Sequence, residues 1–503
     1  MGVRNDIGRK KSPAQSAGSR TGELPAAFDM LLGNESWAVL EEECGLSDLA
    51  EAQATIVVGP PILATKLGSR MRTWVPATLC VAVFLAVSTV YNVRVPLYEA
   101  PDEIAHARYI TIIAEEGRLP RFETIAEYES WQPPLYYVIG AGTLKVLGLE
   151  SPQGLEWNPS FRFNSAVPAE RVNWVHTSDE DFPYSEPVLA VHVLRGISTL
   201  FGAGTIVFIY LTAALIFPRR RLLSFTAAAT ASLIPQFAFI SAAASNDPPS
   251  YFFAAATVYL GLRHLRDGGM VWLVLAALAI SLGALTKLST LVIVGVVPFA
   301  AVLLQSNSWR QKASQLAILA VLPLTLAGWF YLRSMILWGA VFPDRLFEGA
   351  MNPHPIWHPD YRYVFLGHLR ETFWYAGGPT TIRLAPVIYD ALNIIALLAL
   401  GGVIVTLVSR RLTNFEKWGV ILLSALPVMA LVMVLYVSIK IDFQPQGRYL
   451  FGAMPAFAVL IPVGLSALFS PYSRRDHPAM LAAPALLLVL NVYIFTRILP
   501  QHY

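Results

Sequence analysis

WVPATLCVAVFLAVSTVYNVRVPLYEAPDEIAHARY, residues 74–109, is the stretch that decides the fold. Its first half, residues 74–91, is apolar and uncharged, and a helix of about 20 such residues crosses roughly 30 Å of hydrocarbon. Basic residues collect in cytoplasmic loops, and three of them precede this run: Lys66, Arg70 and Arg72. We therefore predict that the chain emerges on the outer side of the membrane near Asn92, with the acidic second half just outside the bilayer.

The composition of the chain agrees with a membrane protein. Of its 503 residues, 55% are hydrophobic and 14% are charged, whereas a soluble protein carries about a quarter charged residues. The net charge of +3 is too small to indicate a class of partner. Cys44 lies in a polar segment and Cys80 in the first apolar run, which argues against a disulfide framework and against a thiolate metal site.

Apolar runs of similar length recur along the chain, so we predict an all-α polytopic membrane protein with about 11 transmembrane helices. The expected spans lie near residues 74–91, 194–217, 222–244, 250–265, 270–286, 288–305, 315–337, 386–408, 418–438, 450–469 and 479–498.

One further run, Leu135 to Leu149, is only about 15 residues long and contains Lys145, so its length is marginal for crossing. If it crossed, the Arg219 to Arg221 triplet would face outside. If it lies in the interface, the triplet and the later basic turns are all cytoplasmic. We therefore predict an interfacial helix here, a long first outer loop over residues 92–193, and a carboxyl end on the outer side.

The predicted organisation has three parts. We predict that residues 1–65 form a disordered cytoplasmic tail, with at most a short helix around residues 31–46. A cleavable signal peptide is not expected, because no short apolar segment lies near Met1. Residues 66–337 form a transmembrane module that includes outer loop 92–193. Residues 338–503 form a second transmembrane region with outer loop 338–385.

The first outer loop opens with EAPDEIAHARY, residues 99–109. Pro101 at the first helical position, followed by acidic residues, indicates a helix start. Asp102 and His106 are four residues apart and share a helix face, where they could hold and deprotonate an acceptor hydroxyl. The alternative is that Asp102 and Glu103 only complement the helix dipole.

Further candidate motifs follow along the outer face. QPPLYY, residues 132–137, fixes the start of the short helix, although Tyr136 and Tyr137 are equally typical of an interfacial aromatic belt. SNDPP, residues 245–249, places Asp247 at the end of a span. Lys287 lies between two short apolar halves, where a buried cation costs about 2.5–3.5 kcal/mol, so it needs a partner. Arg448, in QGRY, residues 446–449, could bind a phosphate oxygen or simply lipid headgroups.

The ordered set of these motifs resembles the GT-C superfamily of membrane glycosyltransferases, which includes protein O-mannosyltransferases and lipid A aminoarabinose transferases. The resemblance covers residues ~74 to 460 and is closest to a bacterial subgroup of unassigned substrate. It is carried by the acidic pair Asp102 and Glu103, by His106, and by the segments at residues 117–120, 132–137, 245–247, 286–288 and 446–449.

The resemblance implies a GT-C-like catalytic module in residues 66–337 and a variable carboxyl-terminal region. It implies a catalytic carboxylate at Asp102, with Glu103 beside it, and a second one at Asp247. The aminoarabinose transferases have a lysine where this chain has Gln132, so a lysine contact to phosphate is absent there and that particular reaction is in doubt.

We therefore predict an inverting glycosyltransferase of the outer face of the cytoplasmic membrane. Its donor would be a polyprenyl-phosphate hexose or pentose, and its acceptor an envelope glycan, lipid or protein; no nucleic-acid partner is expected. Arg448, Lys287 and Tyr449 are assigned to the donor phosphate, and His106, Gln132 and Tyr136 to the acceptor or to orientation. No cofactor or metal is expected, although Asp102, Glu103 and His106 could ligate a divalent ion.

Two alternatives remain at this point. A secondary transporter or flippase would also be polytopic, but it usually has internal symmetry and charged segments near the midplane. An O-antigen ligase or polymerase would also use lipid-linked sugar, but by resemblance it carries its large outer loop late in the chain. Neither the Trp- and His-bearing loop, residues 344–381, nor the tail identifies an acceptor.

Overall fold

The computed structural model describes residues 61–123, 125–163, 167–289, 293, 295–341, 351–409, 412–470 and 476–503, and for residues 61–73, 125, 126, 168 and 169 only the backbone. The chain divides into two units, Met1–Lys66 and Leu67–Tyr503. The predicted tail and its short helix lie almost wholly outside the described residues. All that follows concerns the second unit and the start of the helix that leads into it.

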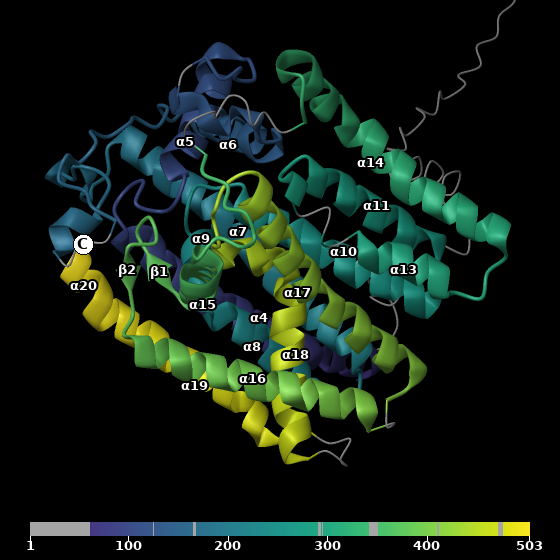
Figure 1. The fold of residues 1–503 in the computed structure, drawn as a ribbon. Coiled ribbons are helices and arrows are strands. Elements are labelled where there is room, and N and C mark those ends of the chain that lie inside the picture. Colours follow the sequence, from purple (N-terminus) through teal and green to yellow (C-terminus); the bar gives the residue numbers. More distant parts are fainter. Residues whose placement is uncertain are drawn as a thin grey trace, which may run out of the picture. The chain divides into compact units, whose positions relative to one another are not determined.

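The described chain is mostly helical, as predicted (Figure 1). Its longer helices are α4 (Pro61–Arg94), α7 (Glu186–Ile216), α8 (Arg221–Leu233), α9 (Pro235–Ser241), α10 (Asp247–Asp267), α11 (Met270–Ala284), α13 (Val296–Leu304), α14 (Trp309–Trp338), α16 (Pro386–Val408), α17 (Asn414–Lys440), α18 (Met454–Phe469) and α19 (Ala482–Tyr493). The chain ends in a π-helical turn, η8 (Ile494–Ile498), and α20 (Leu499–His502), which continue α19.

Within the described residues, seven helical segments are long and apolar enough to cross a membrane: Trp74–Arg94, Glu186–Ile216, Trp309–Trp338, Pro386–Val408, Asn414–Lys440, Gly447–Phe469 and Pro478–His502. An eighth is added if α8 and α9, bent by 63° at their junction, form one broken span. The bend follows from Pro235, which opens α9 and cannot continue the hydrogen bonding of α8. The protein is therefore a multi-pass membrane protein, while the count of about 11 spans stays a prediction.

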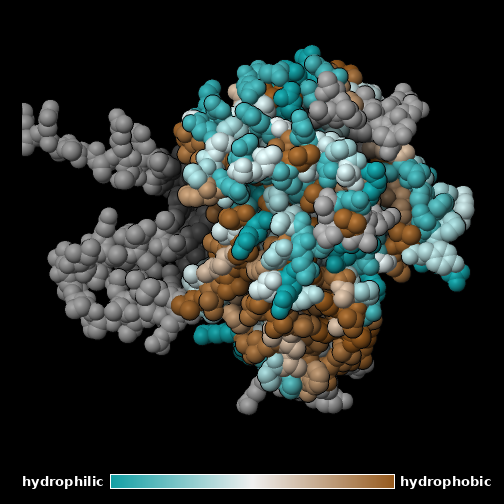
Figure 2. All heavy atoms as spheres, turned by 90° about the vertical axis from the view of Figure 1, so that its left-hand side faces the viewer, coloured by the Kyte–Doolittle hydropathy of each residue, from teal (hydrophilic) through white to brown (hydrophobic). Residues whose placement is uncertain are grey.

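Hydrophobic side chains are distributed as this assignment requires. On the face drawn in Figure 2 they gather over the lower part of the molecule, and hydrophilic side chains gather over the upper part. Helices α5 and α6 lie at this upper end in Figure 1. The helices pack closely below it: a Cβ on Gly402 of α16 would lie 1.9 Å from the carbonyl oxygen of Gly464 in α18. Small residues at such crossings let helix backbones approach each other in a membrane.

Residues 92–193, the predicted first outer loop, contain short helices. They are α5 (Glu103–Glu116), α6 (Leu135–Leu147) and three 3-10 turns, η1 (Ile125–Trp131), η2 (Pro168–Arg171) and η3 (Ser178–Glu180). The predicted helix start is wrong by two residues. Pro101 lies in the turn before α5, because Asp102 has a left-handed backbone (φ +65°) that cannot belong to a helix.

The segment before α16 adds a feature that an all-α prediction lacks. It contains a π-helical turn, η5 (Tyr361–Phe365), α15 (Leu366–Trp374), and an antiparallel hairpin of β1 (Ala376–Gly377) and β2 (Ile382–Arg383). Two more 3-10 turns, η6 (Gly447–Ala453) and η7 (Pro478–Leu481), precede α18 and α19. Turn η6 packs against α10, α15 and α17, and this packing positions the site described next.

Candidate active site

Asp102 stands at the amino-terminal end of α5, as its N-cap residue, and its side chain forms no cap hydrogen bond. Its carboxylate instead reaches across the fold: Oδ2 accepts from Arg448 Nη2 at 2.6 Å, and Oδ1 accepts from the Tyr128 hydroxyl at 3.2 Å. The dipole of α5 favours a negative charge at this position. The structure therefore joins Asp102 and Arg448, which are 346 residues apart in the sequence.

Arg448 is held in a defined orientation by turn η6. Gly447 precedes it and donates its backbone N–H to Thr372 Oγ1 at 2.6 Å, and a Cβ at Gly447 would lie 2.2 Å from the backbone nitrogen of Phe373. Only glycine permits this close approach to α15. Arg448 Nε then donates to Gln446 Oε1 at 2.8 Å, which leaves both terminal nitrogens to face the carboxylates.

Asp247 and Lys287 form the second half of the cluster. Asp247 opens α10, and its Oδ1 accepts from Lys287 Nζ at 2.5 Å, while its Oδ2 lies 3.6 Å from Arg448 Nη1. The partner expected for the cation of Lys287 is thus Asp247. Tyr449 packs its ring beside both cations, with Arg448 Cζ 5.1 Å and Lys287 Nζ 5.6 Å from the ring centre.

Two carboxylates and two cations thus form a compact polar cluster, which we call the four-charge cluster: Asp102, Asp247, Lys287 and Arg448. Buried charges require this kind of mutual compensation. The members differ in exposure: the side chains of Asp247 and Arg448 are 2% and 4% exposed, whereas that of Asp102 is 33% exposed. Asp102 is therefore the carboxylate that an arriving molecule reaches first.

The ionisation of Asp102 follows from its surroundings. Burial raises the pKa of this carboxyl, but the charge of Arg448 and the neighbouring cations outweigh burial and lower the pKa from 3.8 to about 2. Asp102 is therefore an anion at neutral pH, and its basicity depends on how firmly Arg448 holds it.

His106 lies one turn further along α5 and faces an aromatic group. Its Nδ1 lies 2.9 Å from the Tyr137 hydroxyl, and Tyr137 stacks on Tyr109 with ring centres 3.8 Å apart. Burial lowers the pKa of His106 to about 4, so the imidazole is neutral at pH 7. The sequence pointed to Tyr136, but the contact to His106 comes from Tyr137.

Gln132 and Tyr136 are placed differently from each other. Gln132 Oε1 accepts from Asn246 Nδ2 at 3.1 Å, so Gln132 touches the residue next to Asp247. The hydroxyl of Tyr136 instead pairs with Ser198 Oγ at 3.0 Å, and its ring is fully buried against α7. Gln132 therefore borders the four-charge cluster, whereas Tyr136 lies in a packing contact.

Glu103 is occupied elsewhere. Arg195 of α7 donates to both of its oxygens at 2.8 Å, and the backbone N–H groups of Tyr98 and Ala244 donate at 2.9 and 2.8 Å. Arg195 also donates to three carbonyl oxygens, that of Asn92 in the last turn of α4 and those of Val95 and Pro96 just after it. With Glu103 bound to Arg195, the residues Asp102, Glu103 and His106 do not converge as a metal-ligand set.

Several residues of the site were not singled out from the sequence. Tyr128 binds Asp102, Gln446 holds Arg448, and Glu129 is a carboxyl buried beside them. Burial, followed by the charge of Asp102, raises the pKa of Glu129 to about 8. Gln446 lies within the QGRY segment, residues 446–449, but nothing in the local pattern marks Tyr128 or Glu129. Arg195, in contrast, is a cation within a long apolar helix, which is a recognisable signal of a functional or structural partner.

One protein-family model matches part of this chain. Residues 191–331 match the family model described as dolichyl-phosphate-mannose-protein mannosyltransferase. The match includes Asp247 and Lys287 but neither Asp102 nor Arg448. A comparison with curated proteins found no match.

Solved structures also resemble this chain. One is a crystal structure of ArnT from Cupriavidus metallidurans bound to undecaprenyl phosphate, with 15% sequence identity and a TM-score of 0.45. The match covers 84% of this chain and 73% of the ArnT chain. Another is the Archaeoglobus fulgidus oligosaccharyltransferase tethered to an acceptor peptide, with 12% sequence identity and a TM-score of 0.40. The match covers 86% of this chain and 56% of the oligosaccharyltransferase chain.

Proposed function

We propose that this chain is a membrane glycosyltransferase of the GT-C superfamily, and that it transfers a sugar from a polyprenyl-phosphate donor to an acceptor at the outer face of the cytoplasmic membrane. The family-model match over residues 191–331 supports the proposal. The observation that carries the proposal is the contact between Asp102 and Arg448. It places a carboxylate with base chemistry directly beside a guanidinium suited to phosphate. The family match favours this reaction over the transporter and ligase alternatives.

The donor phosphate is assigned to Arg448 and Lys287. A donor phosphodiester carries one negative charge, and the polyprenyl phosphate that leaves carries more. Cations that face the phosphate therefore stabilise the transition state more strongly than they stabilise the bound donor, and this difference is what lowers the barrier. Tyr449, beside both cations, lines the same position.

The reaction is a single displacement. The acceptor oxygen forms a bond to the anomeric carbon as the bond from that carbon to the phosphate oxygen breaks, and the configuration inverts. The acceptor proton passes to Asp102, and the electron pair of the broken bond leaves with the polyprenyl phosphate. Since the leaving group is already a good anion, a general acid is not needed, in contrast to glycoside hydrolysis.

Asp102 and the donor phosphate compete for the same guanidinium. In the structure Asp102 occupies Arg448 Nη2, the group that a phosphate oxygen would take. Binding of the donor then releases Asp102, and the loss of its cationic partner raises its pKa towards the range of a useful base. The base is thus available only when the donor is in place.

Asp247 and Glu103 take positioning roles in this scheme. Asp247 orients Lys287 and the second terminal nitrogen of Arg448. Glu103, through Arg195, fixes the start of α5 and with it the adjacent Asp102. His106 and Gln132 border the site on the side of the outer loop, where the acceptor would approach.

The proposal is tested with purified full-length protein, a panel of polyprenyl-phosphate sugars, and an envelope extract as the source of acceptor. The wild type should release polyprenyl phosphate from at least one donor. Asp102→Asn should lose about 10²–10⁴-fold in turnover while it still binds the donor, because the base is removed and the phosphate site is kept. Asp390→Asn is the matched control, since Asp390 is an exposed residue of α16 paired with Arg370. Unchanged turnover of Asp102→Asn would remove the base assignment.

A further inference from the structure

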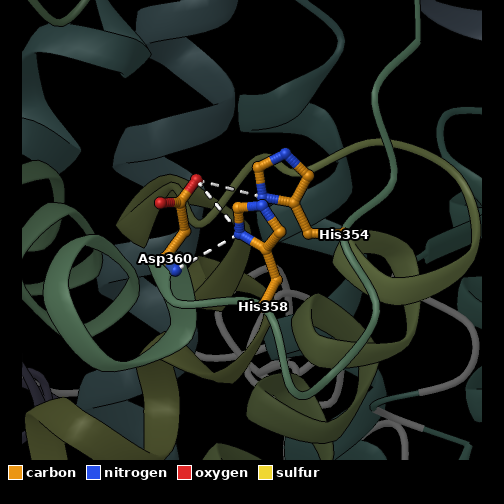
Figure 3. A group of neighbouring side chains, drawn as sticks. All are labelled: His354, His358 and Asp360. Carbon is orange, nitrogen blue, oxygen red and sulfur yellow. Dashed lines mark hydrogen bonds and ion pairs between the residues drawn. The ribbon is translucent and has the colours of Figure 1, made fainter.

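A second group of chemically active side chains lies in the outer segment before α15. It comes from HPIWHPD, residues 354–360, and consists of His354, His358 and Asp360 (Figure 3). The proposed transfer reaction uses none of them. The three side chains turn towards one another, and one potential ligand atom from each lies within 4.8 Å of the other two.

The spacing of the ligand atoms is close to that of a metal site. A tetrahedral zinc ion with ligand bonds of about 2.0–2.2 Å holds its ligand atoms roughly 3.3–3.6 Å apart. Asp360 Oδ2 lies 3.1 Å from His354 Nδ1 and 3.5 Å from His358 Nδ1. The nitrogens of the two imidazoles lie within 4.8 Å of each other. His358 Nδ1 accepts from the backbone N–H of Asp360 at 3.3 Å, a hydrogen bond that the metal would replace, and the His358 side chain is 39% exposed and has room to turn.

A half-turn of the Asn352 side-chain amide would free Nδ1 of His354 for a ligand bond. Nδ1 is buried, and its neighbour is Asp360 Oδ2 at 3.1 Å. The other ring nitrogen, Nε2, lies 3.0 Å from the amide nitrogen Nδ2 of Asn352 and accepts from it. When the amide makes this half-turn, its oxygen faces Nε2, that nitrogen carries the proton and Nδ1 offers its lone pair. A metal-binding histidine is usually oriented by such a second hydrogen bond.

We propose that His354, His358 and Asp360 bind a divalent transition-metal ion, and that the ion is Zn²⁺. Two imidazole nitrogens and one carboxylate oxygen form a ligand set that zinc commonly takes, whereas Mg²⁺ and Ca²⁺ prefer oxygen ligands. Three protein ligands leave a fourth position for water or for a group of a bound molecule.

The proposed metal site is connected to the segment that carries Arg448. Phe443 stacks on the ring of His354 with centres 4.4 Å apart, and its backbone N–H donates to the carbonyl oxygen of Asn352. The backbone N–H of Asn352 donates in turn to Asp442 Oδ1 at 2.9 Å. A bound ion would therefore fix residues 352–360 against residues 442–449, the segment that contains Arg448 and Tyr449. The site is thus a brace for the donor-binding turn, at a distance from the reacting atoms.

Zinc binding is measured directly on the purified full-length protein in detergent. The protein is stripped with a chelator, dialysed, and titrated with Zn²⁺ in a calorimeter, and Co²⁺ is added separately to record the visible absorption of a tetrahedral site. We expect one ion per chain for the wild type. His354→Gln and Asp360→Asn should each weaken binding by more than the ~10–100-fold that loss of a second-shell partner causes, and Asn352→Ala by about that factor.

His368→Gln is the matched control, because His368 lies on the following helix, α15, outside the cluster. It should bind Zn²⁺ as the wild type does. Asp360→Asn keeps the size of the side chain, and its elution as a single species on gel filtration shows that it is folded. The proposal is overturned if the wild type binds no Zn²⁺ stoichiometrically, or if His354→Gln and Asp360→Asn bind it as well as His368→Gln does. These results do not depend on any sugar donor, so they are independent of the proposed transfer reaction.

Discussion

Arg448 contacts two carboxylates at once, Asp102 at 2.6 Å and Asp247 at 3.6 Å, and is almost fully buried. A buried guanidinium compensated in this way is a strong site for a competing anion, because a phosphate can replace a carboxylate with similar geometry. The adjacent carboxylates Asp102 and Glu103 have different partners. Asp102 faces Arg448 and is partly exposed, whereas both oxygens of Glu103 are bound by Arg195.

Glu129 provides a test at this scale through its pKa. Burial raises this pKa to about 8, so the carboxyl is mostly protonated at pH 6.5 and ionises as the pH rises through 8. The new negative charge next to Asp102 should repel the donor phosphate, and kcat/KM for the donor should fall above pH 8. Glu129→Gln, which imitates the protonated form, should match the wild type at pH 6.5 and lose this alkaline fall. A pH profile with the same alkaline limb in both proteins would show that Glu129 does not cause it.

At the scale of elements, the start of α5 depends on a contact with α7. Arg195 binds Glu103 and three carbonyl oxygens between Asn92 and Pro96, so it ties the end of α4 to the start of α5. Both side chains of the ion pair are buried, at 1% and 0% exposure. Loss of one partner leaves an uncompensated buried charge, which is far more costly than loss of both.

Arg195→Met should therefore destabilise the protein by roughly 3–5 kcal/mol, and the double variant Arg195→Met with Glu103→Met should recover a large part of this loss. Thermal unfolding in detergent measures both. Because Asp102 is adjacent to Glu103, the single variant should also lose transfer activity. Equal melting temperatures for the single and the double variant would contradict the role assigned to this ion pair.

The elements also show what the sequence could predict. Length and hydropathy predicted α4, α7, α14, α16 and α17 close to their observed positions, because an apolar run in a membrane has few alternatives to a helix. The charge of Lys287 predicted a partner for the same physical reason. The hairpin of β1 and β2, the left-handed turn at Asp102, and the contacts of Tyr128 and Glu129 could not be predicted. They depend on which segments meet in space, and no local periodicity encodes that.

At the scale of the whole molecule, Asp102, Asp247, Lys287 and Arg448 come from four separate segments and meet in one cluster. The basic turns of the sequence predict that this cluster lies outside the cytoplasmic membrane. This orientation is an expectation that labelling can test, because exposed positions exist in the predicted outer loops and in the first turn of α17.

In a Cys44→Ser background, Asp179→Cys and Trp357→Cys should react with a membrane-impermeant thiol reagent applied to intact cells. Lys417→Cys, near the start of α17, should react only after the membrane is permeabilised. Cys80 is buried and should not contribute to the signal. Labelling of Lys417→Cys in intact cells, with protection of the other two, would reverse the proposed topology.

The most direct test of the account is the binding of polyprenyl phosphate, without any sugar, to the purified protein and its variants. In the proposed mechanism Asp102 occupies the position of the lipid phosphate on Arg448. Arg448→Ala should therefore bind this lipid roughly 10–100-fold more weakly, since a charge-assisted hydrogen bond contributes about 1.5–3 kcal/mol. Asp102→Asn should bind it more tightly than the wild type, because the competing carboxylate is gone. If Arg448→Ala binds as well as the wild type, and Asp102→Asn binds no better, the phosphate site lies elsewhere and the account is contradicted.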